Sequence, residues 1–144
     1  MKTKVMFDTN AFDLLQKSMV NLQQLSKKYS FYISRIQIEE IAAIPDTKKD
    51  VREKNVVSII ELHPTLIPTP FSWDAIDFSH FSFQREGSYW KILKETKANL
   101  NDALIAATAI HEDCTLITED TELLRKMRAL NKPAMTFSEF ITDL

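Results

Sequence analysis

Three aspartates stand at the boundaries of apolar segments, where carboxylates could bind a ligand. Asp8 directly follows the predicted strand KVMF at 4–7, Asp120 closely follows TLIT at 115–118, and Asp102 opens the apolar stretch ALIAATAI. If the two short segments are parallel strands of one sheet, Asp8 and Asp120 point into one crevice, because ligand sites form beyond the carboxyl ends of such strands. Both residues also have a plain structural interpretation, since aspartate is a favoured helix N-cap and a helical pattern follows each of them.

Asp102 is harder to explain as part of a helix cap. The helix that it opens is so apolar that it must be buried on most sides. A carboxylate there lies in the favourable field of the helix N-terminus, and this field stabilises the ionised form that a hard cation requires. The structural alternative is an ordinary first-turn acid with Asn101 as the cap.

A fourth acid must be chosen between Glu39 and Glu40. At about 100° per residue, Glu40 falls between Ile36 and Ile44, inside the apolar face of the predicted helix. Glu39 falls nearer Arg35, on the polar side. Because an unpaired buried charge is costly, a glutamate in the apolar face needs a partner. We therefore expect Glu40 to face the crevice and Glu39 to face solvent.

Four carboxylates that meet in one crevice repel each other and raise each other's pKa values unless a cation is present. A ligand set made only of oxygen atoms suits Mg²⁺ or Mn²⁺ better than zinc. Such an ion binds a phosphate oxygen and lowers the pKa of an attacking water molecule. The pattern of acids therefore favours hydrolysis of a phosphodiester bond.

The elements that must position these acids follow an alternating pattern. Short apolar segments predict strands at residues 4–7, 31–34, 66–67, 115–118 and 135–137. Helical spacing predicts helices at residues 11–25, 36–44, 46–62, 101–110 and 122–130, with a short helix at the C-terminus. Alternation of this kind is typical of an α/β fold whose central, mostly parallel sheet of four to five strands is covered on both faces.

Composition excludes several classes of protein. The chain has 144 residues, about the size of one domain, and a formal net charge of −2, which offers no strong attraction to nucleic acid. Its one glycine, Gly87, excludes a glycine-rich phosphate loop, and its one cysteine excludes a cysteine-rich zinc site. No apolar stretch approaches the roughly 20 residues that span a bilayer, and the N-terminus is too acidic for a signal peptide. We expect a cytoplasmic protein with no membrane contact.

The chain resembles a PIN domain, and within that superfamily the VapC-type toxin ribonucleases. The resemblance rests on FDTNAF at 7–12, ISRIQIEEI at 33–41, NDALIAATAI at 101–110 and LITED at 116–120. It implies one PIN domain over residues 1–144, with a three-layer α/β/α fold. It further implies an endoribonuclease that uses Mg²⁺ or Mn²⁺ to cut RNA.

The resemblance also implies roles for individual residues. The family's catalytic and metal-binding acids fall, in chain order, on Asp8, Glu40, Asp102 and Asp120. Its small polar residue after the first acid falls on Asn10, and its supporting hydroxyl falls on Thr118. Glu119 departs from the pattern, because these proteins often carry a basic or neutral residue there, so it could add to the metal site or alter it.

Partners follow from the same resemblance. VapC-type toxins imply a cognate antitoxin protein that blocks the cleft, and a homodimer. The alternative is a catalytically inactive PIN scaffold that binds RNA or a protein partner. A phosphohydrolase of the haloacid dehalogenase type ranks last, because that family needs a second aspartate where this chain has Asn10.

Other polar and aromatic groups have weaker interpretations. Two basic sets could hold RNA phosphates but are more simply solvated helix faces: Lys91, Lys94 and Lys97, and Arg125, Lys126 and Arg128. Three aromatic residues could stack on unpaired bases but are more often part of a core or an interface: Trp73, Tyr89 and Trp90. Residues 61–90 match no part of the family pattern.

Overall fold

The computed structural model describes residues 2–67 and 100–144, and within them the predicted strands form a single sheet. The strands are β1 (Thr3–Phe7), β2 (Tyr29–Ser34), β3 (Thr65–Ile67), β4 (Thr115–Ile117) and β5 (Ala134–Met135). Their order is β3-β2-β1-β4-β5, and every neighbouring pair runs parallel. The predicted α/β class is confirmed, with five strands and a fully parallel sheet in the described residues.

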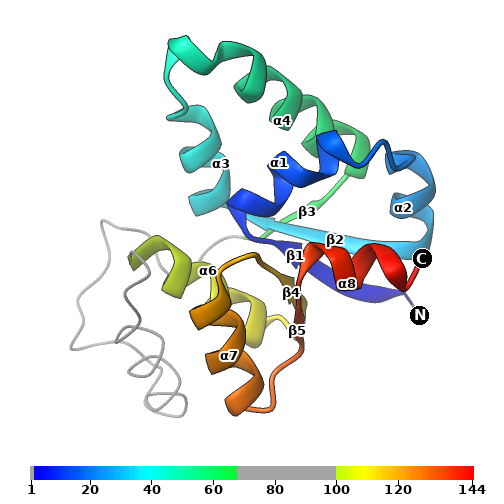
Figure 1. Ribbon diagram of the computed structural model, residues 1–144, viewed down its shortest axis with the longest axis vertical. Helices are drawn as coiled ribbons and strands as arrows, with labels where there is room; N and C mark the ends of the chain where they lie inside the picture. Colours follow the sequence, from blue (N-terminus) through cyan, green and yellow to red (C-terminus); the bar gives the residue numbers. More distant parts are fainter. Residues whose placement is uncertain (1, 68–99) are drawn as a thin grey trace.

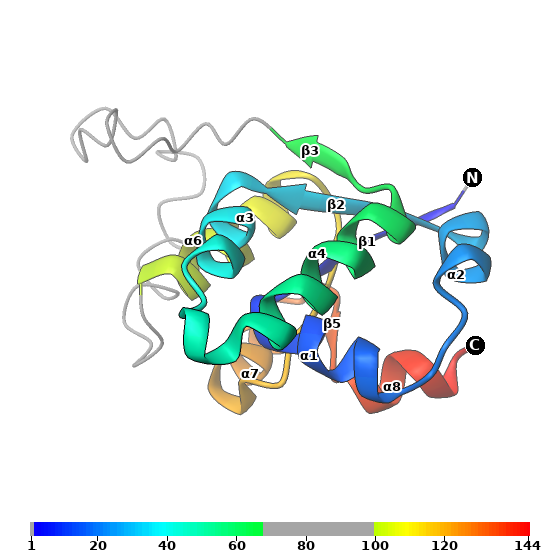
Figure 2. The same ribbon diagram turned by 90° about the horizontal axis from the view of Figure 1, so that it is seen from above.

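Helices cover both faces of the sheet and give the molecule three layers (Figures 1 and 2). The described helices are α1 (Thr9–Lys17), α2 (Leu22–Lys28), α3 (Arg35–Ala42), α4 (Lys49–Leu62), α6 (Leu100–His111), α7 (Thr121–Ala129) and α8 (Phe137–Thr142), with a 3₁₀ turn at Asp46–Lys48. In Figure 1, α1 to α4 lie above the sheet, whereas α6 and α7 lie below it.

The core divides into two clusters because successive strand side chains point to opposite faces. In β1, Met6 packs with the apolar residues of α6 and α7, whereas Val5 and Phe7 pack with those of α1, α2 and α8. Phe7 stacks on Phe31 of the neighbouring strand, with ring centroids 5.4 Å apart. The central strands are therefore buried on both faces, as their continuous apolar sequences indicate.

The single helix expected over residues 11–25 is wrong. The chain forms two helices there, α1 and α2, separated by a turn at residues 18–21. Met19 has a φ of 56° in this turn, and the Asn21 side chain accepts hydrogen bonds from the backbone N–H groups of Gln23 and Gln24. The asparagine cap starts a new helix, although the apolar spacing continues through the turn.

The strand expected at residues 135–137 ends earlier than its apolar sequence suggests. Thr136 is the N-cap of α8, and its hydroxyl accepts a hydrogen bond from the backbone N–H of Glu139. Phe137 is therefore the first residue of α8 and packs into the core from that helix.

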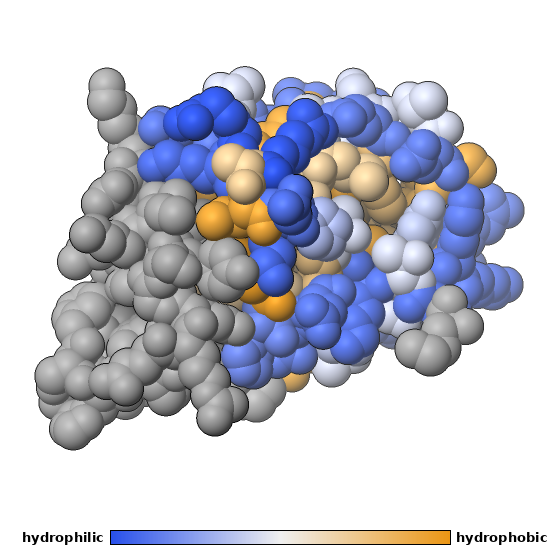
Figure 3. All heavy atoms as spheres, turned by 90° about the horizontal axis from the view of Figure 1, so that it is seen from below, coloured by the Kyte–Doolittle hydropathy of each residue, from blue (hydrophilic) through white to orange (hydrophobic). Residues whose placement is uncertain are grey.

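Much of the surface is polar, with local exceptions. On the face shown in Figure 3, hydrophilic residues surround smaller hydrophobic areas. Four aliphatic side chains of α4 are exposed, at Val51, Val56, Val57 and Ile60. Among the described helices, none is both long enough and apolar enough to cross a membrane.

The basic set at residues 91–97 and the aromatic residues Trp73, Tyr89 and Trp90 lie outside the described residues.

Candidate active site

The carboxyl ends of the central strands bring the predicted acids into one region. Asp8 follows β1 and Asp120 lies just beyond β4, and these strands are neighbours in the sheet. Glu40 comes from α3, which follows β2, and Asp102 comes from the first turn of α6. We call these four residues, Asp8, Glu40, Asp102 and Asp120, the acidic edge.

Asp8 is the most deeply buried member of the acidic edge, with 1% of its surface exposed. Its Oδ1 accepts a hydrogen bond of 2.8 Å from the backbone N–H of Thr9, and its Oδ2 accepts one of 2.8 Å from the Thr118 hydroxyl. Burial raises the pKa of Asp8, and the charge of Asp120 adds to this rise, while the two hydrogen bonds oppose it. Asp8 is thus held in place by one donor on each oxygen.

Thr118 links two members of the acidic edge. Its hydroxyl donates to Asp8 and accepts a hydrogen bond of 3.1 Å from the backbone N–H of Asp120. Asp120 is also the N-cap of α7, because its Oδ1 accepts from the backbone N–H groups of Glu122 and Leu123, each at 3.0 Å. Asp120 can therefore cap α7 and belong to the acidic edge at the same time.

Glu40 points inward and Glu39 outward, as their helical spacing indicates. Glu39 is exposed, and its Oε1 accepts a hydrogen bond of 2.7 Å from the Arg35 guanidinium. Glu40 is less exposed, and among the described residues its buried Oε1 has no hydrogen-bond partner. Burial raises the pKa of Glu40, and the charge of Asp8 raises it further. The nearby Thr9 hydroxyl lowers the pKa of Glu40, although the Thr9 Oγ1 forms no hydrogen bond among the described residues.

The surroundings of Asp102 raise its pKa, as expected for acids that meet in one crevice without a cation. Burial raises the pKa of Asp102 from 3.8 to about 7, and the charges of Asp8, Glu40 and Asp120 all act in the same direction. The carboxylates are thus close enough to disfavour each other's ionised forms. Within the described part of the chain, however, no three His, Cys, Asp or Glu side chains are arranged to hold a metal ion as they stand.

The three supporting residues predicted from the sequence, Asn10, Thr118 and Glu119, lie in different surroundings. Thr118 is buried and contacts two of the acids, as described above. Asn10 is exposed in the first turn of α1. Glu119 turns to α8, where its Oε1 accepts a hydrogen bond of 2.8 Å from the backbone N–H of Phe137. This contact caps the N-terminus of α8, and it gives Glu119 a structural role that the sequence pattern did not indicate.

Gln37 is a buried site residue that the sequence interpretation missed. Its Nε2 donates a hydrogen bond of 2.6 Å to the Phe7 carbonyl, and its Oε1 accepts the backbone N–H of Ser34. The sequence did contain an indication, because serine followed three residues later by glutamine at a helix start is the pattern of a capping box.

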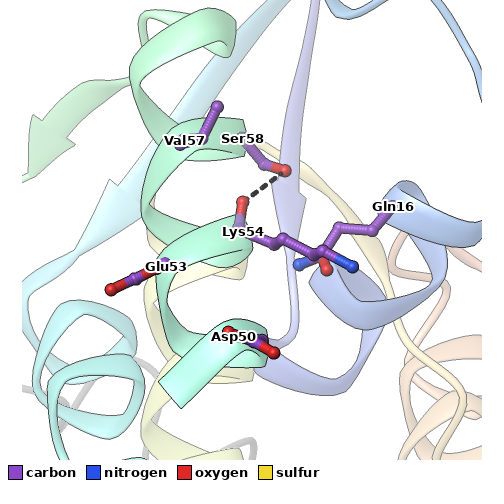
Figure 4. A pocket seen from close by; sticks show the side chains of 6 residues that line it. All are labelled: Gln16, Asp50, Glu53, Lys54, Val57 and Ser58. Atoms are coloured by element: carbon purple, nitrogen blue, oxygen red, sulfur yellow. Dashed lines mark hydrogen bonds between the residues drawn. The ribbon is translucent and has the colours of Figure 1, made fainter. Parts of the chain in front are cut away.

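The cavity drawn in Figure 4 is separate from the acidic edge. It has a volume of about 480 Å³ and lies between α1 and α4, lined by Gln16, Asp50, Glu53, Lys54, Val57 and Ser58. One lining residue, Gln16, donates a hydrogen bond to Asn55, which in turn donates one of 3.1 Å to Asp13. We call Asp13, Gln16 and Asn55 the α1–α4 contact. No buried side-chain polar atom of Gln16 or Asn55 lacks a hydrogen-bond partner, so this contact has the character of a structural cluster.

Comparison with solved structures finds the same fold in two complexes. VapBC2 from Rickettsia felis, bound to a DNA fragment from its promoter, contains a chain that matches with a TM-score of 0.61 and 20% identity, over 93% of this chain and 98% of that chain. FitAB bound to an IR36 DNA fragment matches with a TM-score of 0.54 and 18% identity, over 92% of this chain and 94% of that chain.

Comparison with curated proteins finds no match. The sequence model of the PIN domain, in contrast, matches residues 5–129, which include all four members of the acidic edge and most of the sheet. The parallel sheet, the position of the acids and this match agree with one another. The chain belongs to the PIN domain family.

Proposed function

We propose that this protein is a Mg²⁺- or Mn²⁺-dependent endoribonuclease of the cytoplasm, acting as the toxin of a VapBC-type pair. PIN domains are generally nucleases, and the chain belongs to that family. The observation that carries the proposal is the acidic edge itself: two carboxylates beyond the ends of neighbouring strands and two from helices α3 and α6, three of the four with a raised pKa.

The donor set fits a hard divalent cation. All the side chains are carboxylates, and Mg²⁺ and Mn²⁺ prefer oxygen ligands. The buried Oε1 of Glu40, which has no hydrogen-bond partner among the described residues, is an acceptor in need of a positive partner. A cation would also relieve the repulsion that contributes to the raised pKa of Asp102.

Asp8, Glu40 and Asp102 would hold the ion, and Asp120 would complete the acidic pocket. When bound, the ion would supply Lewis-acid stabilisation of the scissile phosphate and would make an attacking water molecule more acidic. The Thr118 hydroxyl and the Thr9 backbone N–H orient the two oxygens of Asp8. These bonds keep Asp8 in one position, so that its charge is directed at the crevice.

RNA is proposed as the substrate from the resemblance to VapC-type toxins. Of the basic set on α7, Arg128 is paired with Glu139 at 2.8 Å and Lys126 lies 3.9 Å from Glu122, while Arg125 is exposed. Arg125 is therefore the member of this set that is best placed to contact a phosphate from solvent.

We propose a cognate antitoxin protein and a homodimer as partners. Support for the antitoxin comes from the two solved relatives, VapBC2 and FitAB, both of which are complexes bound to DNA. The homodimer rests on the family resemblance, and the molar mass of the purified protein in solution would test it.

Cleavage of a mixed pool of single-stranded and structured RNAs tests the proposal. The wild-type protein should cut with Mn²⁺ or Mg²⁺ and should stop when a chelator is added, and Asp102→Asn should not cut. Equal cutting by both proteins would indicate a contaminating nuclease. A folded protein that neither cuts RNA nor binds Mn²⁺ would instead favour the inactive scaffold.

A further inference from the structure

The ladder between β1 and β2 stops before the strands end. Its last paired residues are Met6 and Tyr32, although β1 continues to Phe7 and β2 to Ser34. Asp8 donates its backbone N–H to Ile117 of β4, so the polar groups of Phe7 face β2. In a continued parallel ladder, the next bond would therefore join the Ser34 N–H to the Phe7 carbonyl.

The carboxamide of Gln37 takes the place of this bond. Its Oε1 accepts the Ser34 N–H, and its Nε2 donates to the Phe7 carbonyl at 2.6 Å. Gln37 has none of its surface exposed, so water does not compete for these two bonds. A side-chain amide thus joins the ends of two strands where the backbone pairing has stopped, at the point where the crevice opens.

Gln37 is linked to two members of the acidic edge, Asp8 and Glu40. Phe7 is the residue before Asp8, so a bond to its carbonyl restrains the peptide that carries Asp8. Glu40 lies three residues after Gln37 on α3, on the same side of that helix. One carboxamide therefore ties the backbone of the first acid to the helix of the second.

We propose that Gln37 is a positioning residue, which fixes where Glu40 lies relative to Asp8. It touches no substrate and acts through the two carboxylates. The role of Gln37 in catalysis rests on the proposed function. The restraint that Gln37 places on the two acids exists in the metal-free protein as well. Both states can therefore be tested.

The test compares Gln37 with a buried amide elsewhere in the fold. Gln37→Met keeps the volume and removes both bonds, and Gln37→Asn keeps an amide that is one methylene too short to reach both strands. Asn55→Leu is the matched control, because Asn55 is equally buried and equally hydrogen-bonded, but at the α1–α4 contact. Urea unfolding of each variant shows that it is folded and how much stability it has lost.

Mn²⁺ titration, followed by calorimetry or by the Mn²⁺ electron paramagnetic resonance signal, is the first readout. Both Gln37 variants should bind Mn²⁺ about 10-fold more weakly, as expected when a group that orients a metal ligand is removed. Asn55→Leu should stay within about two-fold of the wild type, since distant sites act nearly independently. Wild-type affinity in both Gln37 variants, or an equal loss in Asn55→Leu, would overturn the proposal.

The carboxyl ¹³C chemical shifts of Asp8 and Glu40 in metal-free protein are the second readout. They should move in the Gln37 variants and stay unchanged in Asn55→Leu. If the wild type binds no Mn²⁺, the proposed function fails, and these shifts still decide the positioning role. Unchanged shifts in the Gln37 variants would overturn it.

Discussion

Helix α1 has an aspartate in each of two polar regions, Asp8 as its N-cap at the acidic edge and Asp13 at the α1–α4 contact. At the α1–α4 contact, Asn55 donates to Asp13 and accepts from Gln16, and no buried side-chain polar atom of Gln16 or Asn55 lacks a hydrogen-bond partner. At the acidic edge, the buried Oε1 of Glu40 meets no donor among the described residues. Burial raises the pKa values of Asp8, Glu40 and Asp102, and their neighbours add to the effect.

This difference separates a polar cluster that serves the fold from one that serves a ligand. A structural cluster gains stability because its buried groups satisfy each other. Carboxylates that repel one another cost stability, and a fold retains them when something positive binds there. The comparison therefore supports a cation site at the acidic edge and none at the α1–α4 contact, and mutations in the two regions should have different effects.

The largest expected difference lies between the two aspartates. Asp8→Asn keeps the shape of the side chain but removes its charge, and it should reduce RNA cleavage by at least about 100-fold, since even groups that only orient a metal ligand contribute 10- to 100-fold. Asp13→Asn should cleave at nearly the wild-type rate. Initial cleavage rates at saturating Mn²⁺ measure both, and similar rates for the two variants would contradict the assignment of Asp8.

A second contrast separates stability from activity. Thr118→Val removes the hydroxyl that donates to Asp8, and Asn55→Leu removes the amide that joins Asp13 to Gln16. Each should lower the free energy of unfolding by about 1–3 kcal/mol, because Thr118→Val takes a donor from the buried Asp8 and Asn55→Leu removes both hydrogen bonds of a buried amide. Urea unfolding measures this loss. Only Thr118→Val should also slow cleavage, and Thr118→Ser, which keeps the hydroxyl, should restore both properties.

The pH dependence of stability sharpens the comparison further. The pKa of Asp102 is about 7 in the folded protein, above its ordinary value of 3.8. The folded state therefore holds a proton that the unfolded chain releases, so stability in the presence of a chelator should fall as the pH rises towards 7 and level off above it. Urea unfolding at several pH values should show a smaller fall in Asp102→Asn. An equal fall in both proteins would assign the effect to other groups.

The smallest expected effect concerns Glu119. Because its carboxylate accepts the first backbone N–H of α8, Glu119→Ala should lower the free energy of unfolding by about 0.5–1 kcal/mol, as for the loss of a helix cap. Thermal unfolding measures this change. Mn²⁺ affinity should remain that of the wild type, and a clear loss of affinity would return Glu119 to the metal site.

Local sequence patterns predicted much of this fold. The spacing and content of apolar residues predicted all five strands, because buried parallel strands have continuous apolar sequences. The same reasoning failed at residues 18–21, where the cap formed by Asn21 divides one apolar pattern into two helices. The exact end of β5 was also missed, since the Thr136 cap starts α8 within an apolar run.

The candidate site was predictable where a side chain follows a periodic element. Helical spacing distinguished Glu40 from Glu39, and strand ends placed Asp8 and Asp120 at one edge of the sheet. Contacts between distant segments could not be predicted in this way. The bonds from Gln37 to Phe7 and from Glu119 to Phe137 depend on how separate elements pack, and the pKa of Asp102 depends on three acids brought together by the fold.

Mn²⁺ binding to the wild-type protein, to Glu40→Gln and to Glu39→Gln tests the cation site most directly. The two glutamates are adjacent in sequence, but Glu40 belongs to the acidic edge and Glu39 pairs with Arg35 at the surface. We predict that the wild type and Glu39→Gln bind Mn²⁺ equally well, and that Glu40→Gln binds it at least about 10-fold more weakly. Equal binding by all three proteins, or no binding by the wild type, would contradict a cation site at the acidic edge.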